Sequence, residues 1–287
     1  MMHDRNQSAK VSLFHIGPPK TATTWLFQCL SEHPEIRTSK RDTIHFFDIC
    51  YFKGYDWYHA QFTEGDGDVL FDPSFSYVCS PKAIDRIHQY NPAAKSIVCI
   101  RNPIDRAYSH YWHLRRTIRN LPFSDLIDNY NSFATWVEHG FVTDNIIRAQ
   151  QLFGEEQVHI LVFDDLQSDP TGSLKALFEF AQIDPYFQSG SADSIINPAR
   201  TPAGPLARSI SKFHAALAPR LQRTPIIRFL EDQFTGLDEY RNGVPPDLQQ
   251  ILCEICREEI LAMSELTGRD LTGWLTSENE QTGPPEH

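Results

Sequence analysis

Short apolar stretches alternate with longer amphipathic stretches along most of the chain. The apolar stretches predict strands, which are expected at residues 11–17, 68–74, 94–103 and 158–165. The amphipathic stretches predict helices, which are expected at residues 23–34, 81–91, 104–116, 173–183 and 247–268. Strands that alternate with helices are typical of an α/β domain with a mainly parallel central sheet flanked by helices.

The pattern predicts one domain. No repeat, low-complexity tract or long linker interrupts the chain, so we expect residues 11–275 to fold together, with a helical C-terminal extension that begins at about residue 190. The polar residues 1–10 predict a flexible N-terminus, and residues 276–287 predict a disordered tail.

Composition and charge narrow the classes of partner. The formal net charge of -11 over 287 residues argues against a chain that wraps nucleic acid or a long polyanionic glycan, so a compact or neutral substrate is expected. No apolar run approaches the length of a membrane span, and the polar N-terminus favours a cytoplasmic protein. The scattered cysteines indicate reduced thiols, and Cys253 and Cys256 are expected to be buried on a helix rather than to bind zinc.

The stretch FHIGPPKTATTWL, at residues 14–26, predicts a strand, a phosphate-cradling loop and a helix. A helix that begins near Thr21 directs its unpaired amides at an anion, while Lys20 adds charge and the threonine hydroxyls add donors. The loop lacks the Gly-Lys-Ser/Thr ending of P-loop nucleotide hydrolases. It therefore suits a 5′-phosphate group, although its threonines could also simply cap the helix.

A second stretch, IRNPIDRAYSHY, places Arg101 at the end of a strand and Ser109 two helical turns further on. Asn102 and Pro103 suit the start of a helix. An arginine and a serine in this arrangement can hold a second phosphate in the crevice where open α/β sheets bind ligands. A well-capped helix that carries an exposed arginine is the alternative.

Taken together, the two stretches resemble the sulfotransferases that use 3′-phosphoadenosine 5′-phosphosulfate (PAPS), in particular the bacterial and carbohydrate-type branch. The family's loop, PKxGTTxL, is matched at Pro19, Lys20, Thr23, Thr24 and Leu26, and its 3′-phosphate motif is matched by AKSIVCIRNPIDRAYSHY. The resemblance extends through VHILVFDDLQSDP and INPARTP to LTGRDLTGWL, and so covers about residues 11–275.

The resemblance implies a binding site for PAPS and its product 3′-phosphoadenosine 5′-phosphate (PAP). Arg101 and Ser109 are the implied 3′-phosphate ligands, and Trp25 stands where part of the family stacks a ring on adenine. Arg200, in NPARTP, is a further candidate for the nucleotide. The residues expected to bind the 5′-phosphosulfate are Pro19, Lys20, Thr21, Ala22, Thr23 and Thr24.

Three positions depart from the family pattern. Ala22 replaces the usual glycine, which a helical first turn tolerates but a positive φ would not. In SKRDTIHFFD the family's glutamate is replaced by Thr43, or by Asp42 if one residue is inserted, whereas His45 is retained. The family's Glu-Lys-Ser-Pro reads Asp72-Pro73-Ser74-Phe75, without the lysine.

The expected chemistry is an in-line displacement in which Lys20 stabilises the leaving phosphate oxygen, with no metal required. His45 is the first candidate for the base that takes the proton of the acceptor hydroxyl, and Asp42 is a candidate to orient or replace it. A histidine that only packs beside two phenylalanines is the alternative. Asp72, read mainly as a strand-end cap or acceptor-pocket residue, and His113 are reserves.

The acceptor is expected to be a small hydroxylated molecule such as a metabolite, a lipid or polyketide, or a sugar. Two other classes of function stay open, a P-loop-type kinase and a non-catalytic nucleotide-binding protein, and the sequence does not predict the oligomeric state. Aromatic residues could line an apolar acceptor pocket, and those considered are Phe47, Tyr51, Phe52, Trp57, Phe75 and Tyr77.

Overall fold

The computed structural model of the protein describes residues 10–114, 122–127, 129–193 and 243–276. The predicted Arg200, most of the C-terminal extension, residues 1–9 and residues 277–287 lie outside this part of the chain. Among the described residues, no helix combines the length and apolarity that a bilayer span requires.

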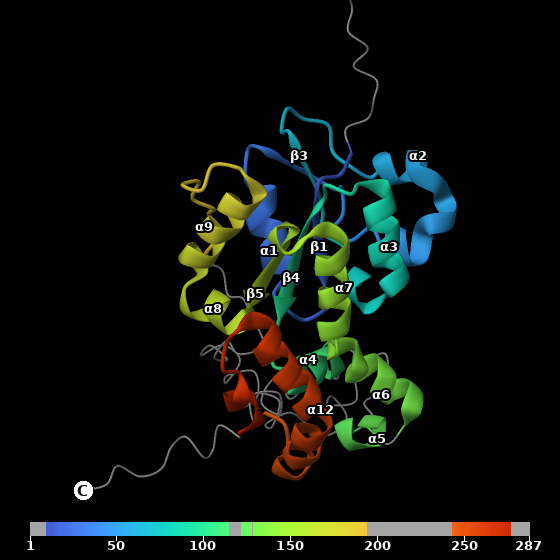
Figure 1. Ribbon diagram of the computed structural model, residues 1–287, viewed down its shortest axis with the longest axis vertical. Coiled ribbons are helices and arrows are strands. Elements are labelled where there is room, and N and C mark those ends of the chain that lie inside the picture. The colour runs from blue at the N-terminus through green and yellow to red at the C-terminus, as the bar shows by residue number, and fades with distance from the viewer. Residues whose placement is uncertain (1–9, 115–121, 128, 194–242, 277–287) are drawn as a thin grey trace, which may run out of the picture.

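A five-stranded parallel sheet forms the centre of the molecule (Figure 1). The strand order is β2-β3-β1-β4-β5, and every described pair is parallel. The chain therefore leaves β1 towards one edge of the sheet and later returns to its other side, which makes the carboxyl end of β1 the topological switch point where such folds bind ligands. The strands are β1 (Leu13–Gly17), β2 (Ile36–Thr38), β3 (Val69–Asp72), β4 (Lys95–Ile100) and β5 (Val158–Val162).

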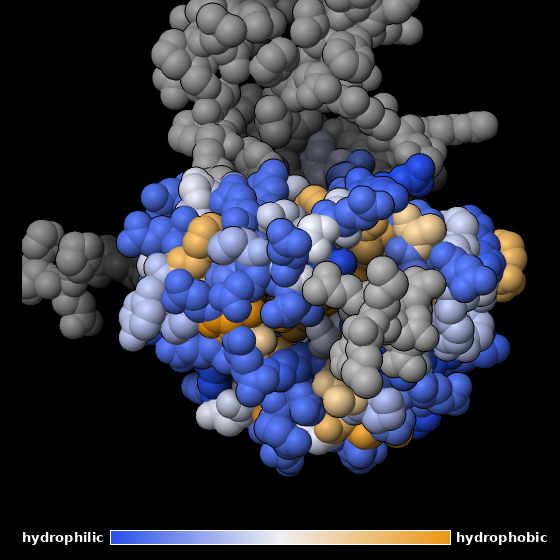
Figure 2. Space-filling model, turned by 90° about the horizontal axis from the view of Figure 1, so that it is seen from above, coloured by the Kyte–Doolittle hydropathy of each residue, from blue (hydrophilic) through white to orange (hydrophobic). Residues whose placement is uncertain are grey.

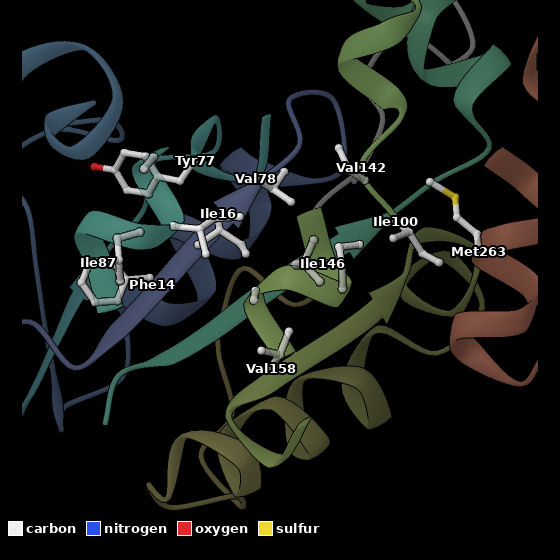
Figure 3. Packing of buried hydrophobic residues seen from close by; sticks show 14 of the residues in the cluster. Phe14, Ile16, Tyr77, Val78, Ile87, Ile100, Val142, Ile146, Val158 and Met263 are labelled. Carbon is white, nitrogen blue, oxygen red and sulfur yellow. The ribbon is translucent and has the colours of Figure 1, made fainter. Parts of the chain in front are cut away.

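Helices cover both faces of the sheet, as the alternation of apolar residues requires (Figure 1). Phe14 and Ile16 point into one apolar cluster, with α3 and α7, while Leu13 points into the other, with α1 and α9. In Figure 3 the first cluster continues from Phe14 past Ile146 to Met263 on α12, which packs against α4 and α7. The helices on the two faces are α1 (Thr23–Ser31), α3 (Pro81–Tyr90), α7 (Thr143–Phe153), α8 (Phe163–Ser168) and α9 (Pro170–Ala181).

The remaining helices build the surroundings of the sheet. In Figure 1, α4 and α12 lie below the carboxyl ends of β4 and β5, beside α5 and α6. These elements are α2 (Gly54–His59), α4 (Pro103–Leu114), α5 (Phe123–Ile127), α6 (Tyr130–Trp136) and α12 (Pro246–Thr267), with a π-helical turn over Phe46–Cys50 and a 3-10 turn over Tyr51–Lys53. As predicted, Cys253 and Cys256 are buried on α12.

The fold class is confirmed, and the differences concern individual elements. Strand β2, which has only three residues, was not predicted from the sequence, and neither were α2, α5, α6 and α7. The strand predicted to continue to residue 165 ends at Val162, because Phe163 starts α8. The acidic residues Asp164 and Asp165 lie in the first turn of α8, where they interact favourably with the helix dipole.

Candidate active site

The loop after β1 has a backbone conformation with positive φ angles, which residues other than glycine rarely adopt. Gly17, Lys20 and Ala22 have φ values of 104°, 75° and 61°. A Cβ on Gly17 would lie 1.7 Å from the carbonyl oxygen of Phe75, so only glycine fits there. The Thr21 hydroxyl donates to the Pro18 carbonyl at 2.6 Å and closes the loop on itself. Thr21 therefore stabilises the loop, whereas we had expected its hydroxyl mainly to donate to an anion.

Helix α1 begins at Thr23, and its first turn faces the loop. The Leu26 amide donates to the Ala22 carbonyl at 2.9 Å, which is the first helical hydrogen bond. The amides that precede Leu26 have no partner within the helix and are available to an anion. In this first turn Thr23 is half-buried and Thr24 is exposed. Pro19, within the loop, is buried.

Ala22 contradicts one expectation. It is the N-cap of α1 in the left-handed conformation, not a residue of a helical first turn. An alanine there carries a steric cost that glycine avoids, because its Cβ approaches the following carbonyl group.

We therefore expect Ala22→Gly to raise the free energy of unfolding by about 1 kcal/mol. Urea unfolding followed by circular dichroism measures this. Ala149→Gly is the matched control, because Ala149 lies buried inside α7, where glycine should instead destabilise by about 1 kcal/mol or more. If both variants lose stability to the same degree, Ala22 is not strained.

Lys20 and Arg101 form the cationic part of the site. Arg101, which follows β4, is 6% exposed, donates from Nη1 to the Lys20 carbonyl at 3.0 Å, and lies 4.4 Å from the centre of the Phe163 ring. Burial, with Arg101 and Arg106 nearby, lowers the pKa of Lys20 to about 8. Within the described part of the chain neither Lys20 nor Arg101 is paired with a carboxylate. Two neighbouring cations without a counter-ion are the arrangement that an anionic ligand neutralises.

Helix α4 carries the rest of the second motif. Asn102 caps it as predicted, since its side-chain oxygen accepts from the Ile104 amide at 3.0 Å. Ser109 is 8% exposed and lies two turns after Arg101 on the same connection. Trp25 is only 3% exposed and its indole N–H donates to the Ala192 carbonyl at 3.2 Å, so stacking on adenine stays a prediction.

The segment that follows β3 holds His45 in place. The Ser74 hydroxyl accepts from the amides of Ile44 and His45 at 2.9 and 3.0 Å, and the Tyr77 hydroxyl accepts from the Phe46 amide at 3.0 Å. These bonds fix His45 in the left-handed conformation, with φ 52°. Its ring packs on Phe75, with centroids 5.4 Å apart, and Phe75 also closes over Gly17. His45 thus lies at the same sheet edge as the phosphate-type loop.

The imidazole of His45 is oriented by Ser76 and Asp48. Its Nδ1 lies 2.8 Å from the Ser76 hydroxyl and 3.5 Å from Asp48 Oδ2, and Ser76 donates a short hydrogen bond to the same carboxylate. This arrangement leaves Nε2 for an acceptor hydroxyl, and the Asp48 carboxylate raises the pKa of His45. Asp42, the carboxylate that we had expected to orient His45, is exposed and makes no described hydrogen bond to it. Asp48 orients His45 instead, because the helical turn brings Asp48 beside His45 as an i, i+3 pair.

Asp72 has a structural role at the end of β3. It is fully buried and accepts hydrogen bonds from the Tyr58 and Tyr77 hydroxyls at 2.8 and 3.0 Å and from the Ser74 amide at 2.9 Å. Burial raises its pKa. With three donors around it, Asp72 has the strand-end role that the sequence predicted rather than that of a base.

Sequence reasoning did not single out Arg106 and His110, which lie on the inner side of α4. Arg106 is 1% exposed and donates to the Trp136 carbonyl at the end of α6, where a cation is favourable. Burial and the neighbouring cations Arg106 and Lys20 lower the pKa of His110 to about 3, so this ring is neutral. Partial burial of the His113 ring and the charge of Lys20 lower the pKa of His113.

The described residues hold no group of three or more histidine, cysteine or acidic side chains placed to bind a metal ion. What they bring together is the loop that leads into the unpaired amides of α1, two cations and an oriented imidazole, at the carboxyl ends of three neighbouring strands. Such a site can bind a phosphorylated group, stabilise charge on a leaving oxygen and accept a proton.

Comparison with known proteins agrees with this chemistry. A family model described as "Sulfotransferase domain" matches residues 11–200. Human heparan sulfate glucosamine 3-O-sulfotransferase 6 is 26% identical over 228 residues, which cover 75% of this chain and 66% of that protein. The human bifunctional heparan sulfate N-deacetylase/N-sulfotransferase 2 is 28% identical over 192 residues, 60% of this chain and 22% of that protein.

This chain thus spans two thirds or less of the length of these relatives. Among solved structures, a sulfotransferase from Alicyclobacillus acidocaldarius has a TM-score of 0.69 and 22% sequence identity, with coverage of 93% of this chain and 100% of that chain. The two proteins share the fold.

Proposed function

The chain belongs to the sulfotransferase family, and from this premise we propose that it transfers the sulfuryl group of PAPS to a hydroxyl of a small or compact acceptor. The proposal rests on one observation: Lys20 and Arg101, which pair with no carboxylate of the described residues, lie beside the first amides of α1. These groups fit a ligand that bears phosphate at two places, as PAPS does at its 5′ and 3′ positions.

The proposed reaction forms one bond and breaks one. The acceptor oxygen attacks sulfur, the bond between sulfur and the 5′-phosphate oxygen breaks, and the electron pair stays on that oxygen, giving PAP and a sulfate ester. Lys20 and the first amides of α1 stabilise the developing charge on the leaving oxygen. His45 takes the proton of the hydroxyl at Nε2, while Ser76 and Asp48 hold the ring from Nδ1.

Nucleotide recognition gives the direct test. We expect Arg101→Ala to weaken the binding of PAPS and PAP by roughly 2 to 5 kcal/mol, the range for the loss of one partner of a buried charge pair. The binding of adenosine 5′-phosphosulfate should stay nearly unchanged. Isothermal titration calorimetry with the three nucleotides measures this pattern. Arg148→Ala is the control, since Arg148 is exposed and pairs with Asp85. Equal weakening of all three nucleotides would mean that Arg101 acts only by holding the Lys20 carbonyl.

The same titration separates the other function classes. A kinase would bind its nucleotide with magnesium, whereas the proposed enzyme binds PAP equally well with and without it. A non-catalytic nucleotide-binding protein would bind PAP yet show no PAPS-dependent sulfation of any acceptor in a mixed panel of phenols, alcohols and sugars.

A further inference from the structure

The stretch LTGRDLTGWL, at residues 266–275, turns back from the end of α12 towards the sheet. Gly268, with φ 64°, ends the helix, and the Leu271 amide donates to the Ser264 hydroxyl oxygen at 2.9 Å, which folds the stretch onto α12. A 3-10 turn over Thr272–Leu275 follows. In Figure 1 this part of the chain lies beside α8, at the carboxyl end of β5.

Trp274, in the 3-10 turn, joins the first turns of two helices. Its indole N–H donates to Asp164 Oδ2 at 2.8 Å, at the start of α8. Its carbonyl accepts a hydrogen bond from the side-chain amide of Asn102, the residue that caps α4, at 3.2 Å. Trp274 is 8% exposed. A single residue near the end of the described chain therefore ties the start of α8 to the start of α4.

Arg101 lies between the two points that Trp274 joins. The last residues of β4 and β5 are paired in the sheet, so the next residues, Arg101 and Phe163, leave it side by side. The Arg101 guanidinium lies 4.4 Å from the centre of the Phe163 ring. Trp274 makes its hydrogen bonds to the residue that follows each of them, Asn102 and Asp164. It thus holds both the backbone beside Arg101 and the ring on which the guanidinium rests.

The Arg101 side chain has few direct restraints of its own. Nη1 donates to the Lys20 carbonyl at 3.0 Å, whereas Nε is buried without a hydrogen-bond partner among the described residues. Fixing a long, rotamer-rich side chain at the moment of binding costs conformational entropy, and a side chain that is already held avoids much of this cost. The contacts that hold the neighbours of Arg101 should therefore affect how tightly it binds an anion.

A second contact of the same stretch is of a different kind. Both Nη atoms of Arg269 donate to the Asp165 carboxylate, but these side chains are 44% and 48% exposed. Exposed charged groups are common on this protein, as the mostly hydrophilic face in Figure 2 shows, and an exposed ion pair contributes little. The bond from Trp274 differs, because a buried indole N–H that loses its acceptor is unfavourable.

Building on the proposed PAPS site, we propose that Trp274 is a positioning residue for recognition of the 3′-phosphate. It holds Asn102 and Asp164, and through them it keeps the Arg101 guanidinium in place to meet that phosphate. The 5′ group is assigned to the loop after β1 and the first amides of α1, and no described hydrogen bond links Trp274 to either. Trp274 should therefore affect the 3′-phosphate and leave the 5′ group alone.

PAP and adenosine 5′-monophosphate (AMP) differ only by the 3′-phosphate, so the ratio of their Kd values, measured by calorimetry, reports its recognition. We expect Trp274→Phe and Asp164→Ala to lower the preference for PAP over AMP roughly 2- to 10-fold, the equivalent of one hydrogen bond, with the Kd of AMP unchanged. Asp164→Asn is the matched control. It removes the same charge as Asp164→Ala but keeps an oxygen that accepts from the indole, so it should keep the wild-type preference.

Arg269→Ala, which removes only the exposed ion pair, should also keep that preference. The inference is overturned if Trp274→Phe weakens both nucleotides equally or neither, or if Asp164→Asn and Asp164→Ala lower the preference to the same degree. In each case, PAP binding by the wild type leaves the sulfotransferase proposal standing, whereas a wild-type protein that does not bind PAP overturns both. Asp164 is exposed, so its variants give the readout even if Trp274→Phe does not fold.

Discussion

Replacing Lys20 by alanine should lower turnover at least ~100-fold while the protein stays folded, because one preorganised donor to a developing oxyanion is worth roughly 10²–10³ in rate. The structure strengthens this expectation. Lys20 is held between the end of β1 and Arg101, and no described carboxylate competes for it. Initial-rate assays with PAPS and a phenolic acceptor measure the loss of turnover, and circular dichroism checks that the variant is folded.

The pH dependence provides a second readout of Lys20. Burial and the two arginines lower its pKa to about 8, so in the free enzyme the ammonium form is lost as pH rises through that value. We expect kcat/KM for PAPS to fall above about pH 8 and this limb to be absent in Lys20→Ala. Lys40→Ala is the control, since Lys40 is exposed and its Nζ donates to the Ala60 carbonyl. Near-normal turnover in folded Lys20→Ala would refute the proposed role.

The parts of the site that the sequence predicted are those whose chemistry is local in the chain. The loop after β1 is read from consecutive residues, and Arg101 follows directly from a continuous apolar strand. Parallel strands then bring both to one edge of the sheet by topology alone. The resemblance to sulfotransferases added the roles of these residues, and the family assignment confirms the class of protein.

The parts that the sequence did not predict depend on unusual backbone or distant partners. Asp48 reaches His45 because the segment winds as a π-helical turn, which no periodicity in HFFDIC indicates. Ser76 joins them from 28 residues away. Likewise, the positive φ of Ala22 is set by the closure of the loop, and an apolar run from Val158 to Phe163 does not show that a helix begins within it.

The second prediction with a large expected effect concerns His45 in the proton-transfer step. His45→Ala should remove most of the rate at neutral pH, by about 10²–10⁴-fold for a general base, and should abolish the rising limb of the pH profile. Because His45 must be neutral to accept a proton, and because Asp48 raises its pKa, the wild-type limb should lie above the ~6.5 of an unperturbed histidine. Initial rates at saturating PAPS across pH 5 to 9, roughly the range in which histidine titrates, measure both effects.

Asp48 and Asp42 supply the matched pair that tests how His45 is oriented. Asp48→Asn removes the charge beside Nδ1, so the rising limb should move to lower pH, towards the ordinary histidine value, and the plateau rate should fall as the ring loses its fixed orientation. Asp42→Asn makes the same chemical change at an exposed carboxylate outside this hydrogen-bond network, whose charge raises the pKa of His45 less than that of Asp48 does. Its rising limb should therefore move less than the limb of Asp48→Asn, and its plateau rate should stay close to wild type. Both variants should bind PAP normally, since neither carboxylate is proposed to contact the nucleotide. If Asp42→Asn shifts the limb and Asp48→Asn does not, the family's original acidic position has kept the catalytic role, and His45 with its Asp48 partner only shapes the wall of the site.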